Sequence, residues 1–136
     1  MIKPINKDLL ILSKKSVDAS KDDKQVIIDL VDTIRFHSNS CVGMAANMIG
    51  INKNIIAILV GPISIVMVNP KIISKANMYT TKESCLSLTG ERETTRYKEI
   101  EVEYLDENFN RQRQKYKDFI AQIIQHEIDH LNGIII

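Results

Sequence analysis

The chain has 136 residues, of which 44% are hydrophobic and 26% are charged, and its formal net charge is +1. A composition of this kind is typical of a globular protein with one hydrophobic core, so we expect residues 1–136 to form a single domain. The low net charge gives no electrostatic basis for binding nucleic acid or a membrane surface, and no apolar run reaches membrane-spanning length.

Hydrophobic periodicity predicts one helix near the N-terminus, followed by strands. Residues 22–36 have apolar side chains at helical spacing, with acidic residues in the first turn and Ser20 as a candidate N-cap. The apolar runs 54–60 and 65–68 predict buried strands, and Asn69-Pro70 is expected to close the second.

The second half of the chain predicts two further strands and a final helix. Residues 99–105 alternate apolar and polar side chains, which indicates a half-buried strand. A turn at 106–108 precedes a last strand near 112–116, and a helix follows over about 118–131. Without a βαβ rhythm, this order predicts an α+β fold: mostly antiparallel β-sheets packed around a C-terminal helix, with one N-terminal helix.

The expected C-terminal helix contains the sequence His126-Glu127-Ile128-Asp129-His130. Helical residues four apart lie on one face, so both imidazoles can reach one metal ion while Glu127 acts on a bound water. The chain has only three histidines, and two of them are in this motif. We therefore expect a metal site on this helix.

A tetrahedral site with an open position for water needs a third protein ligand. The chain has one other histidine, His37, which ends the first predicted helix and is better explained as a surface or C-terminal cation. Its two cysteines, Cys41 and Cys85, are expected to stay reduced, because no secretory signal begins the chain and a cytoplasmic protein is indicated. The positions of these residues in the sequence do not decide whether His37, Cys41 or Cys85 is the third ligand.

Three segments together resemble the peptide deformylase family. That family has a Gly-x-Gly-Leu-Ala-Ala-x-Gln loop, a Glu-Gly-Cys-Leu-Ser segment and a Gln-His-Glu-x-Asp-His-Leu helix. Here they correspond to 41–48, 83–87 and 125–131, in the same order. The resemblance covers about residues 5–136.

The resemblance implies that Cys85, His126 and His130 hold one divalent metal ion, with Glu127 as the general acid and base. It implies Fe2+ in the cell, readily replaced by Zn2+ or Ni2+. It also implies an oxyanion site formed by the backbone N–H of Leu86 and by a glutamine whose place Met48 takes here.

The same helix face and the first loop predict a substrate pocket. Positions three, four and seven before His126 share its face, and in the family this pocket accepts methionine. The candidate substrate-binding residues are Val42, Gly43, Met44, Phe119, Gln122 and Ile123. Plain core packing is the alternative for Phe119 and Ile123. We also expect Glu83 and Arg96 to form an ion pair behind Cys85, against the alternative of two separate exposed charges.

Three residues depart from the family pattern. Met48 has no donor for an oxyanion, and neighbouring Asn47 is not expected to replace the glutamine if the segment is extended. Cys41 and Ser84 replace glycines, so each could oppose a positive φ angle.

The leading interpretation is metal-dependent removal of the N-formyl group from N-formylmethionyl peptides, with activity reduced by Met48. The alternatives are a deformylase-like enzyme for another small N-acyl substrate, a non-catalytic binder of N-terminal peptides, and, ranked last, a general HExxH endopeptidase. The expected partner is a formylated nascent peptide, and the expected state is a monomer. Family members often carry a C-terminal extension that in some contacts the ribosome; this chain ends at Ile136, which leaves that docking mode open.

Overall fold

The computed structural model describes residues 1–136 and has the α+β fold expected from the sequence. Three α-helices, two 3-10 helices and five strands follow one another along the chain. Their bounds are α1 (Leu9–Leu12), η1 (Lys21–Asp23), α2 (Lys24–Phe36), β1 (Gly43–Ala45), η2 (Ala46–Ile49), β2 (Ile55–Val60), β3 (Ile63–Glu83), β4 (Arg92–Leu105), β5 (Arg111–Lys117) and α3 (Asp118–Leu131). None of the helices combines the length and apolar character that a membrane crossing requires.

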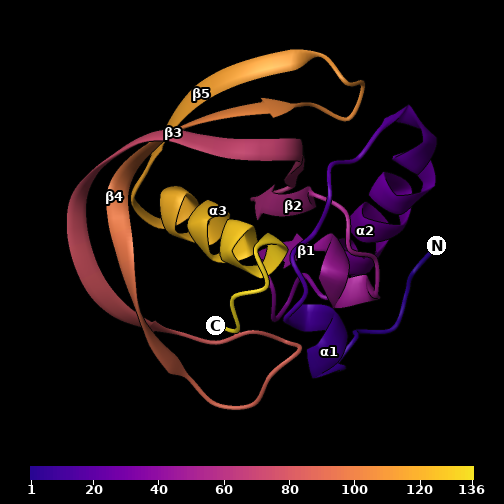
Figure 1. Cartoon of the computed structure of the whole chain (residues 1–136), viewed down its shortest axis with the longest axis horizontal. Coiled ribbons are helices and arrows are strands. Elements are labelled where there is room, and N and C mark those ends of the chain that lie inside the picture. The colour runs from indigo at the N-terminus through magenta and orange to yellow at the C-terminus, as the bar shows by residue number, and fades with distance from the viewer.

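The five strands form a single antiparallel sheet in the order β1-β2-β3-β4-β5. The long strands β3 and β4, together with β5, curl around α3, while α2 lies on the other side of β2 (Figure 1). The sheet therefore holds α3 in the concave side that its curvature creates.

Strand β2 is buried on both faces, which explains its nearly continuous apolar sequence. Ile55 and Ala57 belong to the hydrophobic cluster that contains Leu30 and Ile34 of α2. Ile56 and Ile58 belong to the second cluster, which the apolar face of α3 completes. Alternate residues of one strand thus pack against two different helices. Each fully buried isoleucine contributes roughly 1.5–3 kcal/mol relative to an exposed one.

The predicted N-terminal helix is confirmed, with a 3-10 turn at its start. The Ser20 hydroxyl accepts a hydrogen bond from the backbone N–H of Asp22, and the Ser20 backbone N–H donates to Asp23. This reciprocal cap belongs to η1, from which α2 continues at Lys24.

The expectation that Asn69-Pro70 ends a strand is wrong, because β3 continues to Glu83. The ladder with β4 shifts register between Val68 and Lys71, so the strand passes the proline through a bulge. Asn69 has a φ of 52°, and its side chain bonds both the N–H and the carbonyl of Ala19. This side-chain pairing compensates for the interrupted ladder.

The two remaining predicted strands and the final helix are confirmed. The strand expected at 99–105 begins earlier, at Arg92, and the last strand spans Arg111–Lys117. The helix α3 ends where Asn132 and Gly133 were expected to stop it. Gly133 has a φ of 76°, and a Cβ there would collide with the carbonyl oxygen of Ser13. The chain can turn away from α3 in this way only with glycine.

Candidate metal centre and pocket

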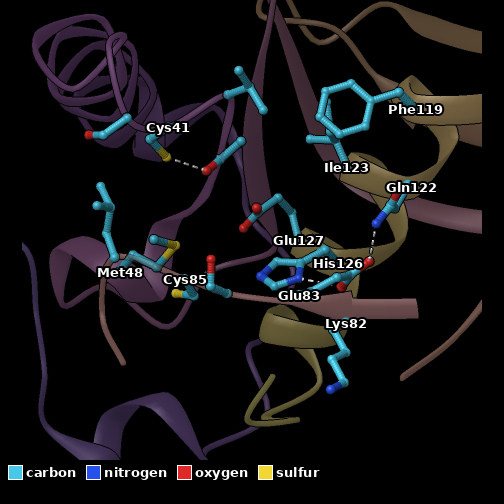
Figure 2. Close-up of a pocket in the computed structure, with 15 residues that line it drawn as sticks. Cys41, Met48, Lys82, Glu83, Cys85, Phe119, Gln122, Ile123, His126 and Glu127 are labelled. Atoms are coloured by element: carbon cyan, nitrogen blue, oxygen red, sulfur yellow. Dashed lines mark hydrogen bonds and ion pairs between the residues drawn. The ribbon is translucent and has the colours of Figure 1, made fainter. Parts of the chain in front are cut away.

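A cavity of about 360 Å³ lies between the start of β1, the end of β3 and one face of α3. Its walls come from three stretches of chain that are far apart in sequence. They are Ser40–Gly43 with Met48, Lys82–Leu86, and the α3 residues Phe119, Gln122, Ile123, His126 and Glu127. Figure 2 shows Glu127 and His126 near the middle of this cavity, with Cys85 and Met48 on one side and Phe119 on the other.

Three residues are close enough to share one metal ion. The ligand atoms of Cys85, His126 and His130 all lie within 4.8 Å of one another. The two imidazoles are one helical turn apart on α3, and both side chains are buried. Cys85 comes from the segment that follows β3, so the fold supplies the third group from a different element.

The arrangement of the two imidazoles suits a cation between them. Their Nε2 atoms are 3.0 Å apart. The Nδ1 of His126 donates to Glu83, because a carboxylate only accepts, so in the neutral ring the Nε2 lone pair faces His130. Two ring nitrogens at this distance share either a proton or a metal cation. The residues present therefore fit a divalent metal ion.

Burial and hydrogen bonding separate the pKa values of these two histidines. Burial lowers the pKa of His130 to about 3, helped by nearby His126, so its ring is neutral and available as a ligand. Burial alone would also lower the pKa of His126, but hydrogen bonds with Cys85 and Glu83 raise it to about 10. The environment that retains a proton on His126 also attracts a metal cation.

The expected ion pair between Glu83 and Arg96 is present and buried. Arg96 Nη2 lies 2.7 Å from Glu83 Oε1, and Arg96 Nε lies 3.0 Å from Oε2. Glu83 Oε1 also accepts from His126 Nδ1 at 2.6 Å. Burial alone would raise the pKa of Glu83, but hydrogen bonds from His126, Arg96 and Gln122 outweigh it and hold the pKa at about 2. Glu83 is therefore a fixed anion that orients the imidazole of His126.

The carboxyl of Glu127 lies in an environment that favours proton exchange. Its residue is 4% exposed, and its Oε1 atom is buried without a hydrogen-bond partner. Burial is the main cause that raises the pKa of Glu127 to about 7; nearby His126 opposes this shift, and nearby Glu83 adds to it. A carboxyl with a pKa near neutrality can both accept and donate a proton in one reaction cycle.

The backbone N–H of Leu86 is an unpaired donor at the wall of the cavity. Leu86 lines the cavity, and its N–H has no hydrogen-bond partner in the protein. The next N–H, of Ser87, bonds Cys85 Sγ at 3.3 Å. An unpaired donor beside Cys85 suits an oxygen that gains negative charge.

Met48 lies in η2 rather than in an extended segment, and it lines the cavity. Its Sδ atom accepts from Ala45 N at 3.5 Å, so the side chain offers no donor there. Asn47 is fully buried, and its Nδ2 donates to the carbonyl oxygen of His130 at 2.7 Å. The Asn47 amide is therefore committed elsewhere and does not replace the missing glutamine.

The other two departures from the family pattern are compatible with the backbone. Neither Cys41 nor Ser84 has a positive φ angle. The Cys41 thiol donates to the Gly43 carbonyl, and burial, followed by nearby Glu127, raises its pKa to about 12. Cys41 therefore remains a thiol, and its sulfur is not in the group formed by Cys85 and the two histidines.

Five of the six expected pocket residues line the cavity. Gly43 lies so close to α3 that a Cβ there would be 2.5 Å from Ile123 Cγ2 and 2.8 Å from Glu127 Oε2. The sixth, Met44, does not line the cavity, because its side chain is fully buried in the core cluster next to α2. Strand β1 alternates its side chains, so Met44 points to the opposite face from its neighbours.

Two residues that contact this network were not expected from the sequence. Asp129 Oδ2 accepts from Arg96 Nη1 at 2.6 Å, and Asn47 reaches His130 as described above. Asp129 lies three residues after His126 on α3, but nothing in the sequence identifies Arg96 as its partner. His37 is the C-cap of α2, and it is not in the group formed by Cys85, His126 and His130.

Comparisons with known proteins agree with this geometry. The family model described as polypeptide deformylase matches residues 2–136. A peptide deformylase from Clostridium beijerinckii is 56% identical over 136 residues, which is 100% of both chains. This degree of identity extends well beyond the three motifs.

Solved structures of peptide deformylases share the fold. The Synechococcus elongatus enzyme in complex with actinonin has a TM-score of 0.85 and 33% identity, and the match covers 97% of this chain and 74% of that one. The Met-Ala-Ser-bound enzyme from Acinetobacter baumannii has a TM-score of 0.88 and 28% identity, with 99% and 97% covered.

Proposed function

The chain belongs to the peptide deformylase family of metal-dependent hydrolases, and on this premise we propose that it removes the N-formyl group from N-formylmethionyl peptides. Its substrate in the cell would be the formylated nascent chain, in the cytoplasm, with the protein acting as a monomer. The reaction adds water across the formamide bond and releases formate and a free amino terminus. The Met-Ala-Ser peptide named for the Acinetobacter structure has the form of such a product.

In this proposal Cys85, His126 and His130 hold one divalent metal ion, Fe2+ in the cell, with Zn2+ or Ni2+ able to take its place. A metal ion at such a site acts as a Lewis acid and lowers the pKa of water toward neutrality. Glu83 fixes the His126 ring through Nδ1, which leaves Nε2 for the metal.

Glu127 moves the proton. Its carboxylate accepts a proton from the attacking water and donates it to the peptide nitrogen as the C–N bond breaks, so the products are the neutral amine and formic acid, which then loses its proton to become formate. A pKa of about 7 suits both halves of this transfer. The buried, unpaired Oε1 atom of Glu127 is the observation on which the proposal chiefly depends.

The backbone N–H of Leu86 stabilises the negative charge that develops on the formyl oxygen. Met48 supplies no second donor. Loss of one oxyanion donor typically lowers turnover on the order of 100- to 1,000-fold, so we propose that this protein is slower than a member with glutamine at this position. The methionine side chain of the substrate would occupy the pocket of Val42, Gly43, Phe119, Gln122 and Ile123.

The test is formate release from a formyl-Met-Ala-Ser peptide by protein loaded anaerobically with iron, and separately with zinc or nickel. A second candidate, cleavage of another small N-acyl group, is favoured by Gln122, which makes the pocket wall more polar. Parallel reactions with acetyl-Met-Ala-Ser and formyl-Gln-Ala-Ser distinguish the two candidate functions. The first peptide changes the acyl group, and the second changes the side chain. Formate release limited to the formyl-Met peptide supports the first proposal, while faster cleavage of either alternative peptide contradicts it.

A further inference from the structure

Gln122 occupies the boundary between the cavity and the buried charges behind the metal group. It lines the cavity from α3, and its Nε2 donates to Glu83 Oε2 at 2.8 Å, as the dashed line in Figure 2 shows. The carboxylate only accepts, so this contact fixes which end of the amide faces Glu83. The Gln122 amide oxygen has no hydrogen-bond partner in the protein. It is not fully buried, so solvent or a ligand can reach it.

Glu83 divides its two oxygens between different groups. Oε1 accepts from His126 Nδ1 and from Arg96, whereas Oε2 accepts from Gln122 and from Arg96 Nε. Arg96 also holds Asp129. Gln122 is therefore the one donor to Glu83 that lines the cavity and is not itself a candidate metal ligand. It holds Oε2 in the orientation that presents Oε1 to His126.

An occupant of the pocket changes the surroundings of this hydrogen bond. A methionine side chain beside Gln122 would exclude water from the Gln122–Glu83 contact, and a hydrogen bond to a charged group strengthens as the local dielectric falls. The carboxylate of Glu83 would then be held more rigidly in the position from which Oε1 accepts from His126 Nδ1, which keeps His126 Nε2 in place for a metal ion.

We propose that Gln122 is a positioning residue that couples occupancy of the side-chain pocket to metal retention, through Glu83 and His126. The inference depends on the proposed function only in taking this cavity as the pocket for the substrate side chain. Coupling between two sites is reciprocal, so a peptide that slows metal loss is itself bound more tightly by the metal-loaded protein.

The experiment measures the rate at which a chelator removes Zn2+ from the loaded protein, alone and with saturating Met-Ala-Ser or Gly-Ala-Ser. The two peptides share a backbone and an amino terminus, so their difference isolates the side chain in the pocket. We expect Met-Ala-Ser to slow zinc loss at least about fivefold more than Gly-Ala-Ser. In Gln122→Met, which keeps the length but lacks the donor, this difference should disappear. Gln122→Leu gives the same comparison if Gln122→Met does not fold.

Phe119→Leu is the matched control, because Phe119 lines the same cavity and makes no hydrogen bond to Glu83. This variant should bind Met-Ala-Ser more weakly. At saturating peptide, however, Met-Ala-Ser should still slow zinc loss more than Gly-Ala-Ser does. The coupling is overturned if Met-Ala-Ser and Gly-Ala-Ser differ in their effect on zinc loss as much in the Gln122 variants as in the unmodified protein. It is also overturned if the two peptides slow zinc loss equally in the unmodified protein. Formate release measured on the same samples separates this result from the proposed function, because zinc loss is read without turnover.

Discussion

Asn47 donates its side-chain amide to the carbonyl oxygen of His130 across 2.7 Å, although 83 residues separate them. The bond ties η2, which carries Met48, to the last turn of α3, which carries the candidate ligand His130. It also commits the Asn47 amide to His130, outside the cavity. The family glutamine therefore has no substitute in the neighbouring residue, and Met48 becomes the residue on which turnover should depend.

Met48→Gln should raise formate release, because it restores a donor where the family has one. An increase on the order of 100-fold in kcat/KM is expected, with metal content unchanged. Met48→Leu, which adds no donor, should give no such increase. If both variants leave the rate as it was, the oxyanion argument is wrong.

Asn47→Ala should lower the free energy of unfolding by about 1–3 kcal/mol, because it removes a buried hydrogen bond and leaves the His130 carbonyl without that donor. Urea unfolding of the metal-free protein measures the difference. Asn47→Asp keeps the size but loses the donor, so it should be at least as destabilising. Wild-type stability in Asn47→Asp would show that the amide contact is energetically unimportant.

Arg96→Met should destabilise the protein by about 3–5 kcal/mol, because it removes the cation that pairs with buried Glu83 and with Asp129. The double variant Arg96→Met with Glu83→Gln should recover part of this loss in the same urea measurement, since Glu83 no longer carries a buried charge, while Asp129 lacks its partner in both variants. A double variant that is no more stable than Arg96→Met would contradict the ion-pair account.

Glu127→Gln should abolish formate release while one equivalent of metal still binds, because Glu127 carries the proton and is not a ligand. Metal analysis and the formate assay on the same sample check both parts. A variant that retains substantial formate release would exclude Glu127 as the proton carrier.

The pH dependence of stability offers a separate test of Glu127. Burial raises its pKa in the folded, metal-free protein from 4.5 to about 7. The stability that this group contributes is fully present below its unfolded pKa, and it is lost as the pH rises through the folded pKa. Glu127→Gln should therefore gain stability relative to the unmodified protein between pH 4.5 and 7, by about 3 kcal/mol in total. If the difference in free energy of unfolding between the two proteins stays constant from pH 4.5 to 7, the pKa of Glu127 is not raised.

Hydrophobic spacing and helix stop signals correctly predicted the helices and strands that are determined by neighbouring residues. The helix Asp118–Leu131 follows from its apolar spacing and its stop at Asn132-Gly133, and the pair of histidines on it follows from helical periodicity. The three motif segments identified Cys85, His126 and His130, which the structure brings close together, because the family resemblance carries long-range information that periodicity lacks.

Contacts between distant elements explain what the sequence did not reveal. Strand β3 continues past Asn69-Pro70 because its pairing with β4 resumes after a bulge, where the Asn69 side chain bonds Ala19, a partner 50 residues away. Met44 faces the core next to α2 because side chains alternate along β1, and the pairing of β1 with β2 sets which face each residue takes. The Arg96–Asp129 and Asn47–His130 contacts likewise depend on how the sheet wraps α3.

Titration of the metal-free protein with Fe2+ under anaerobic conditions, with formate release from formyl-Met-Ala-Ser measured at each step, tests the central claim most directly. The account predicts a rate that rises with added iron, levels off at one equivalent, and is absent from Cys85→Ala at the same iron concentrations. Iron binding at one equivalent with no formate release from the unmodified protein, or an equal rate in Cys85→Ala, would contradict it.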